Sequence, residues 1–235
     1  MKESVSNSTL AAASSPEKST AGGGWSQFIR WSGFGGVVGP VLFVLLFTVA
    51  GFLRPGYSAV RQTVSDLGVG PFAWLVNMPI VILGLLLIAL AIGFYQAMRR
   101  VLSPGLRRSC AVLVALPGLG FIAAGVFTED PSTLIFHILL GATLGLYFPM
   151  VTFFVAGLAL LVARRDGEWR WFGLYSLLAS AATVAVIVFL QLAFMPSSPL
   201  FGFQIAGLAE RADLVEILAW YIILGWRLFR LPSLD

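Results

Sequence analysis

The chain's single histidine, His137, belongs to a set of side chains that could carry out nucleophilic or acid–base chemistry. A serine hydroxyl can act as a nucleophile when a histidine removes its proton and a carboxylate orients that histidine. In this interpretation Ser65 is the nucleophile or a substrate-binding group, and His137 is the general base. The candidate catalytic residues are Ser65, Asp66, Asp130, His137 and Glu216, with Asp130 or Glu216 as the orienting carboxylate. A purely structural interpretation fits Ser65-Asp66 equally well as a turn or helix cap, and Asp130 as a cap of the helix that follows it.

A second set of polar residues could bind a substrate. Three arginines, Arg54, Arg61 and Arg211, suit the phosphate of a lipid head group, because guanidinium groups bind phosphate oxygens in pairs. The candidate binding residues are Arg54, Tyr57, Arg61, Asn77, Glu210, Arg211 and Asp213. Asn77, like Gln191, could instead form hydrogen bonds between helices, which is a common structural role for amides within membranes.

Metal chemistry has weaker support. One histidine with oxygen donors from Asp66, Asp130 or Glu210 makes a poor zinc site, although such a set could hold a harder cation. Cys110 is the only cysteine, which excludes an intrachain disulfide and a multi-cysteine metal site. We therefore assign neither a metal nor a cofactor from the sequence.

The elements that must position these residues are membrane helices. The chain is 58% hydrophobic and only 11% charged, so lipid must surround most of it. Apolar segments of about twenty residues, the length needed to cross a bilayer core, predict an all-α, six-transmembrane-helix bundle. The spans lie at about 33–53, 72–97, 109–127, 133–163, 171–195 and 206–230, the fourth being a tilted or proline-kinked single helix. Residues 1–24, rich in Ser, Ala and Gly, are expected to be a disordered cytoplasmic tail, and residues 25–235 form the membrane domain.

Charge predicts the orientation of the bundle. Twelve of the fifteen Lys and Arg residues fall on one side of these spans, and the positive-inside rule places that side in the cytoplasm. Both termini are then cytoplasmic in a multi-pass protein of the cell (plasma) membrane. The net charge of +4 is explained by this asymmetry, which argues against a nucleic-acid partner.

The opposite face gathers the chemically capable residues at one depth. At 1.5 Å per residue, His137 lies about 9 Å below the outer end of its helix. Glu210, Asp213 and Glu216 are spaced three apart on the last span, within or near the outer leaflet. Ionisable residues inside membranes are functional more often than not, so this depth predicts a polar site facing outer-leaflet lipid.

The first loop also carries a family resemblance. The segments Arg54-Pro-Gly-Tyr57 and Arg61-Gln-Thr-Val-Ser65-Asp66-Leu67-Gly68, followed by Trp74 and Asn77, resemble the opening signature of domain-of-unknown-function family 998. Asp130-Pro131, His137 and Gly207-Leu-Ala-Glu210-Arg211 fall where that family has its later motifs. The resemblance covers about residues 33–230 and implies a six-helix integral membrane protein with a polar cluster at the outer face. It implies no reaction.

Three functions remain open at this point. The first is a membrane-embedded enzyme, such as a hydrolase, that modifies a lipid or lipid-linked substrate. The second is a protein that binds or transports a small solute, ion or proton through His137, Asp213 and Glu216. The third is a structural or lipid-sensing subunit in which the polar cluster specifies helix packing. The expected partners are the lipid bilayer, a lipid head group or small solute, and a second copy of the chain in a homo-oligomer.

Overall fold

The structure is a computed structural model that describes residues 20–163 and 167–232. These residues form helices joined by loops, and they include no strand. The long helices are α1 (Thr20–Leu53), α2 (Trp74–Ala97), α3 (Pro104–Val126), α5 (Phe148–Val162), α6 (Gly167–Phe194) and α7 (Ala206–Phe229). Shorter segments are α4 (Leu134–Phe136), the π-helix η3 (His137–Tyr147) and the 3₁₀ turns η1 (Ser65–Gly68), η2 (Met98–Arg100) and η4 (Pro199–Phe203).

Five helical segments of the described chain are long and apolar enough to cross a membrane. They are Gly24–Leu53, Trp74–Arg100, Pro104–Val126, Leu134–Val162 and Trp169–Phe194. They coincide with the first five expected spans and establish a multi-pass membrane protein. α7 is long enough as well, at 24 residues, but it carries Glu210, Arg211, Asp213 and Glu216. A membrane crossing by α7, the expected sixth span, would therefore depend on packing against the other helices rather than on its own hydrophobicity.

The first and third spans begin earlier than expected, and the fourth is irregular at a different place from the expected proline. Most of the expected tail, residues 1–19, lies outside the described residues, and α1 begins at Thr20 rather than after residue 24. The fourth span runs without interruption through α4, η3 and α5, as a single helix should. Its irregularity is the 11-residue π-helix η3, and not a kink at Pro149, which occupies the first turn of α5.

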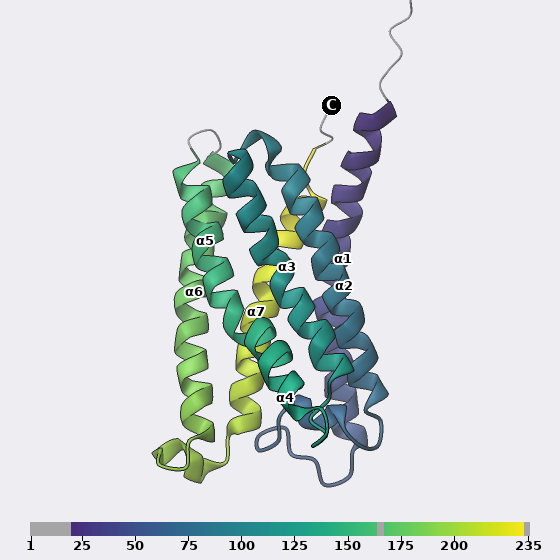
Figure 1. Ribbon diagram of the computed structural model, residues 1–235, viewed down its shortest axis with the longest axis vertical. Helices are drawn as coiled ribbons and strands as arrows, with labels where there is room; N and C mark the ends of the chain where they lie inside the picture. The colour runs from purple at the N-terminus through teal and green to yellow at the C-terminus, as the bar shows by residue number, and fades with distance from the viewer. Residues whose placement is uncertain (1–19, 164–166, 233–235) are drawn as a thin grey trace, which may run out of the picture.

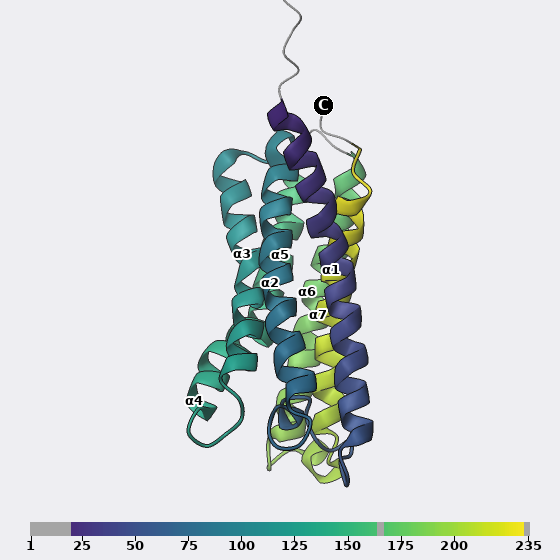
Figure 2. The same ribbon diagram turned by 90° about the vertical axis from the view of Figure 1, so that its right-hand side faces the viewer.

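The helices run side by side along one axis, and α7 packs mainly against α1 and α6 (Figures 1 and 2). The C-terminal half of α7 buries its largest side chains: Trp220 and Tyr221 have no exposed surface. Trp220 stacks on Phe153 of α5 at 4.4 Å between ring centroids and donates a hydrogen bond to Ser176 of α6. The start of α1 and the end of α7 lie at the same end of the bundle (Figure 1).

Glycine lets α3 and η3 approach closely next to the polar residues. A Cβ atom added to Gly120 of α3 would lie 2.3 Å from the amide nitrogen of Gly145 in η3. No real side chain tolerates that distance, so only glycine permits this approach. The contact fixes η3, and with it His137 at its first residue, against the rest of the bundle.

Candidate functional site

The loop between α1 and α2, residues 54–73, is held in place by two arginines. Arg211 of α7 donates to the carbonyl oxygens of Ala59 (2.9 Å) and Gln62 (2.8 Å) and to the hydroxyl of Tyr57. Arg54 donates to the carbonyls of Asp66 and Val69. Each guanidinium group thus satisfies several main-chain acceptors that a loop would otherwise leave open. In this structure Arg211, partly through Tyr57, holds the loop on α7, and Arg54 joins two parts of the loop to each other.

Inside the loop, Thr63 and Asp66 form a reciprocal cap. The Asp66 amide donates to Thr63 Oγ1 (3.0 Å), and the Thr63 amide donates to Asp66 Oδ2 (2.7 Å). This is the bonding pattern of a capping box, which fixes the first turn of a helix, here η1. The carboxylate of Asp66 is used in this turn, and Ser65, at the start of η1, is thereby presented to the interior.

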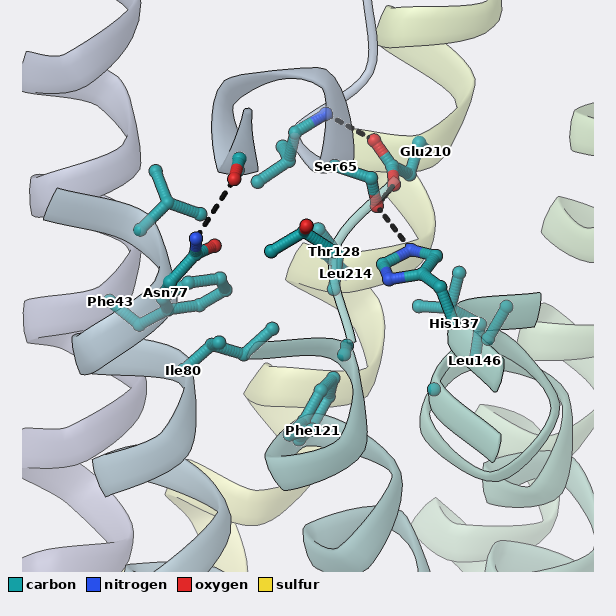
Figure 3. Close-up of a pocket in the computed structure, with 16 residues that line it drawn as sticks. Phe43, Ser65, Asn77, Ile80, Phe121, Thr128, His137, Leu146, Glu210 and Leu214 are labelled. Carbon is teal, nitrogen blue, oxygen red and sulfur yellow. Dashed lines mark hydrogen bonds between the residues drawn. The ribbon is translucent and has the colours of Figure 1, made fainter. Parts of the chain in front are cut away.

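Ser65, His137 and Glu210 meet at one point, although they come from three distant parts of the chain (Figure 3). The Ser65 hydroxyl lies 3.3 Å from Nε2 of His137 and 3.0 Å from Oε1 of Glu210. The other carboxylate oxygen of Glu210 accepts a hydrogen bond from the Val64 amide. His137 and Glu210 are only 6% and 5% exposed, so water contributes little to this group.

The hydrogen atoms shared between Glu210, Ser65 and His137 can be counted. His137 Nδ1 is 2.7 Å from the carbonyl oxygen of Phe127, which can only accept, so Nδ1 carries a hydrogen. Two hydrogens then serve the two contacts of Ser65. In one form, Glu210 is protonated and donates to Ser65, and Ser65 donates to a neutral His137. In the other form, His137 is protonated and donates to Ser65, and Ser65 donates to an ionised Glu210. The two forms differ by the transfer of one proton between Glu210 and His137 through the Ser65 hydroxyl.

This arrangement resembles a serine–histidine dyad but differs from the usual triad in the orienting group. The Phe127 carbonyl, and not Asp130 or Glu216, holds the far nitrogen of His137. Glu129 adds a carboxylate on the near side, with Oε1 3.8 Å from His137 Nε2. Burial raises the pKa of Glu129 above its usual value, and nearby Asp66 acts in the same direction, while His137 opposes them.

The three residues line a cavity of about 40 Å³. A cavity of that size has room for a few water molecules, since about 10–15 Å³ on the same measure holds one. Its polar end is formed by Ser65, Asn77, Thr128, His137 and Glu210, and its deeper wall by Phe43, Ile80, Phe121, Leu146 and Leu214. Asn77 donates to the carbonyl of Gly68 (2.8 Å) and so fixes the end of η1 beside the cavity.

Asp213 and Glu216 form a separate pair on α7. Glu216 Oε2 forms a hydrogen bond of 2.8 Å with Thr183 Oγ1 of α6 and does not contact Ser65. Asp213 is fully buried, and neither of its carboxylate oxygens has a hydrogen-bond partner. Gln191 donates to Tyr147 and bridges α6 to η3. Neither Asp213 nor Glu216 lines the cavity that holds His137.

The remaining candidates lie at the surface. Asp130 is exposed and accepts hydrogen bonds from the amide and hydroxyl of Ser132, which lowers its pKa. It shapes the turn before α4 without capping that helix through its side chain. Arg61 is exposed on the loop. Among the described residues, no three His, Cys, Asp or Glu side chains converge in a way that could hold a metal ion.

Sequence reasoning therefore placed Ser65, His137, Glu210 and Asn77 together but missed three contributors: Glu129, Thr128 and the Phe127 carbonyl. The available signal was their position, because the stretch 127–129 directly precedes the Asp130-Pro131 turn at the level of Ser65. A main-chain carbonyl has no residue type, so no sequence pattern can identify it as a histidine partner.

Comparison with known proteins identifies a family for the chain but no reaction or substrate. No curated protein and no solved structure matched the chain. A family model described as "Protein of unknown function (DUF998)" matches residues 37–227, which include every residue of the cavity. That match covers most of the 235 residues and confirms the resemblance inferred from the first loop. The chain is an integral membrane protein that belongs to the DUF998 family.

Proposed function

We propose that this protein is a membrane-embedded serine hydrolase that cleaves an acyl ester of a lipid or lipid-linked substrate. One observation carries the proposal: the Ser65 hydroxyl contacts Nε2 of His137, whose Nδ1 is held by a main-chain carbonyl, in a cavity lined by both residues. In the neutral form of His137, Nε2 has a free lone pair aimed at the hydroxyl that it would deprotonate.

The reaction follows from these contacts. Ser65 Oγ attacks the ester carbonyl carbon, and its proton passes to His137 Nε2 as the carbon–oxygen bond forms. His137 then returns the proton to the departing alcohol oxygen, which leaves the acyl group on Ser65. A water molecule that gives its proton to His137 attacks this acyl-enzyme and releases the fatty acid, and the proton returns to Ser65.

Glu210 and Glu129 would support these steps in different ways. A protonated Glu210 donates to Ser65 Oγ and leaves the serine hydrogen free for His137, which is the form required for attack. The imidazolium that then forms lies 3.8 Å from a Glu129 oxygen, so ionised Glu129 would stabilise it. The deeper wall of the cavity is apolar, and this favours a substrate with an apolar group next to the ester over a sugar or nucleotide.

A fluorophosphonate bearing an alkyl chain tests the nucleophile directly, because it phosphonylates an activated serine and releases fluoride. We expect one adduct on folded wild-type protein, located at Ser65 by mass spectrometry, and none on Ser65→Ala. Ser132→Ala is the matched control, since Ser132 is an exposed serine that contacts only Asp130. Wild-type protein that binds the probe nowhere, or equally at other serines, contradicts the proposal.

A second candidate function, ion- or proton-linked binding or transport, is favoured by the unpartnered carboxylate of Asp213. If this function holds, wild-type protein reconstituted in vesicles should dissipate an imposed proton or sodium gradient, and Asp213→Asn should not. A flux that is equal in both proteins would argue against it.

We also propose that the arginine-rich end of the bundle, and with it both termini, faces the cytoplasm of the plasma membrane. Ser132 and Ser103 are exposed at opposite ends of α3 and its flanking turns, and the only native cysteine, Cys110, is buried. We therefore expect an impermeant maleimide to label Ser132→Cys in intact cells, and Ser103→Cys only after permeabilisation. The reverse pattern would invert the orientation.

A further inference from the structure

The side chain of Asp213 is unusual among the described residues because both carboxylate oxygens are buried without a hydrogen-bond partner. It lies about two turns into α7 and is fully buried. An ionised carboxylate in such surroundings is strongly unfavourable unless a cation compensates it. The position can therefore be neutral in two ways: the carboxyl group holds a proton, or the ionised carboxylate binds a ligand that supplies positive charge.

Next to Asp213, the Thr183 hydroxyl has two hydrogen-bond acceptors, one of them Glu216, but only one hydrogen. Thr183 Oγ1 lies 2.8 Å from both the carbonyl of Ala179 and Oε2 of Glu216, but a hydroxyl has only one hydrogen to donate. Both contacts are satisfied if Glu216 is protonated and donates to Thr183, which donates to Ala179. Protonation of Glu216 thus gives each contact its own hydrogen, and Asp213 is then the carboxyl group of the pair that has no hydrogen-bond partner.

No cation of the described protein reaches Asp213. Its nearest acidic neighbours are Glu216 and Glu210 on α7, and Tyr147 faces it from η3. Tyr175 of α6 faces Glu216. Arg211, the basic residue closest in sequence, is directed to the loop carbonyls. The histidine of the chain, His137, contacts Glu129 instead.

We propose that Asp213 binds a small monovalent cation of the Na⁺ class, beside a protonated Glu216. Carboxylate oxygens are the ligands that hard cations prefer. One ionised and one neutral carboxyl group balance one positive charge, so the occupied site is neutral, which a membrane interior tolerates. A divalent ion would leave excess charge, and no third carboxylate, histidine or cysteine of the described chain converges there.

Thermal unfolding of the purified protein tests the site. A ligand that binds only the folded state raises the unfolding midpoint, and the shift grows with the logarithm of the ligand concentration above its dissociation constant. We expect NaCl or LiCl to raise the midpoint of wild-type protein by several degrees over choline chloride of equal ionic strength. Asp213→Asn should abolish the shift. Glu216→Gln should keep it, because the glutamine amide donates to Thr183 as the protonated acid does.

Two control variants test whether the cation effect belongs to Asp213. Asp130→Asn removes an exposed carboxylate and should respond like wild-type protein, as should Ser65→Ala, so the result does not depend on hydrolase activity. Absence of a specific cation effect in wild-type protein, or its survival in Asp213→Asn, overturns the proposal. A midpoint that responds to acid but to no metal cation also overturns it, and identifies the ligand as a proton.

A measurement on wild-type protein alone covers the case in which Asp213→Asn fails to fold. Dicyclohexylcarbodiimide reacts with protonated carboxyl groups in apolar surroundings, and the adduct can be located by mass spectrometry. We expect Na⁺ to protect Asp213 at least tenfold, while labelling of Glu216 stays unchanged. Equal labelling of Asp213 with and without Na⁺ contradicts the proposal.

Discussion

Replacement of Gly207 by valine is expected to displace the loop that carries Ser65 from its position on α7. A Cβ atom at Gly207 would lie 2.0 Å from the carbonyl oxygen of Gln62 and 2.8 Å from that of Ala59. Both are main-chain atoms, and both carbonyls accept from Arg211, so they cannot move without breaking that network. Overpacking against rigid backbone typically costs 1–3 kcal/mol or more, and we expect about 3 kcal/mol here.

The measurement is the thermal midpoint together with labelling of Ser65. Gly207→Val should lower the midpoint and abolish the fluorophosphonate adduct, because the Ser65–His137 contact depends on the loop's position. Gly202→Ala provides a matched control on the adjacent η4 turn, where an added Cβ meets nothing within 4 Å. A Gly207→Val protein with wild-type midpoint and labelling would show that the loop is not seated on α7 as described.

Replacement of His137 by asparagine is expected to slow labelling of Ser65 by about 10²–10⁴-fold, the usual contribution of a general base. Asparagine can still donate to the Phe127 carbonyl, so the packing of η3 should survive. It offers no basic nitrogen to Ser65, and the hydroxyl would lose its proton acceptor. The rate constant for phosphonylation, measured at equal folded fraction, isolates this effect from stability.

Glu129→Gln is the comparison for the His137 variant. It removes the charge near Nε2 while leaving the base in place, so we expect a smaller loss, about tenfold. Labelling of His137→Asn at the wild-type rate would mean that Ser65 reacts without a base. The hydrolase would then lose its main support, whereas the cation site on α7 would be unaffected.

Much of the architecture follows from the sequence because lipid imposes strong rules. Apolar runs of bilayer length predicted the first five spans within a few residues at most ends, apart from the earlier starts of α1 and α3. The π-helix could not be predicted, since residues 137–147 look like any apolar helical stretch. It arises where Gly141 and Gly145 pack closely against α3, which is a tertiary effect.

The candidate site was predicted in location but not in its pairings. Glu210, Asp213 and Glu216 share a spacing of three, which suggested a single face. At about 100° per residue, six residues rotate the side chain by about 240°, so the first and last acids diverge by about 120°. Glu210 accordingly contacts Ser65, while Glu216 contacts Thr183 of α6. Depth along a helix is readable from sequence, but direction around it depends on neighbours.

The partners of the arginines also could not be predicted from the sequence. Arg54, Arg61 and Arg211 have the same chemistry and were all assigned to a phosphate group. In the structure Arg54 and Arg211 satisfy loop carbonyls, and only Arg61 is exposed. Carbonyl oxygens occur at every residue, so the sequence contains no sign of which of them will need a donor.

The contact between Ser65 and Glu210 has a consequence for biosynthesis. It joins residues 145 positions apart, and its second member belongs to α7, which leaves the ribosome after the other described helices. The five strongly apolar segments can enter the membrane as they emerge, whereas α7, with four charged residues in its first half, must find partners already inserted. A nascent chain therefore carries Ser65 and His137 through most of its synthesis without a finished pocket. The Ser65–His137–Glu210 cluster is complete only when α7 docks, so truncation before residue 206 should leave a chain that inserts but has no assembled site.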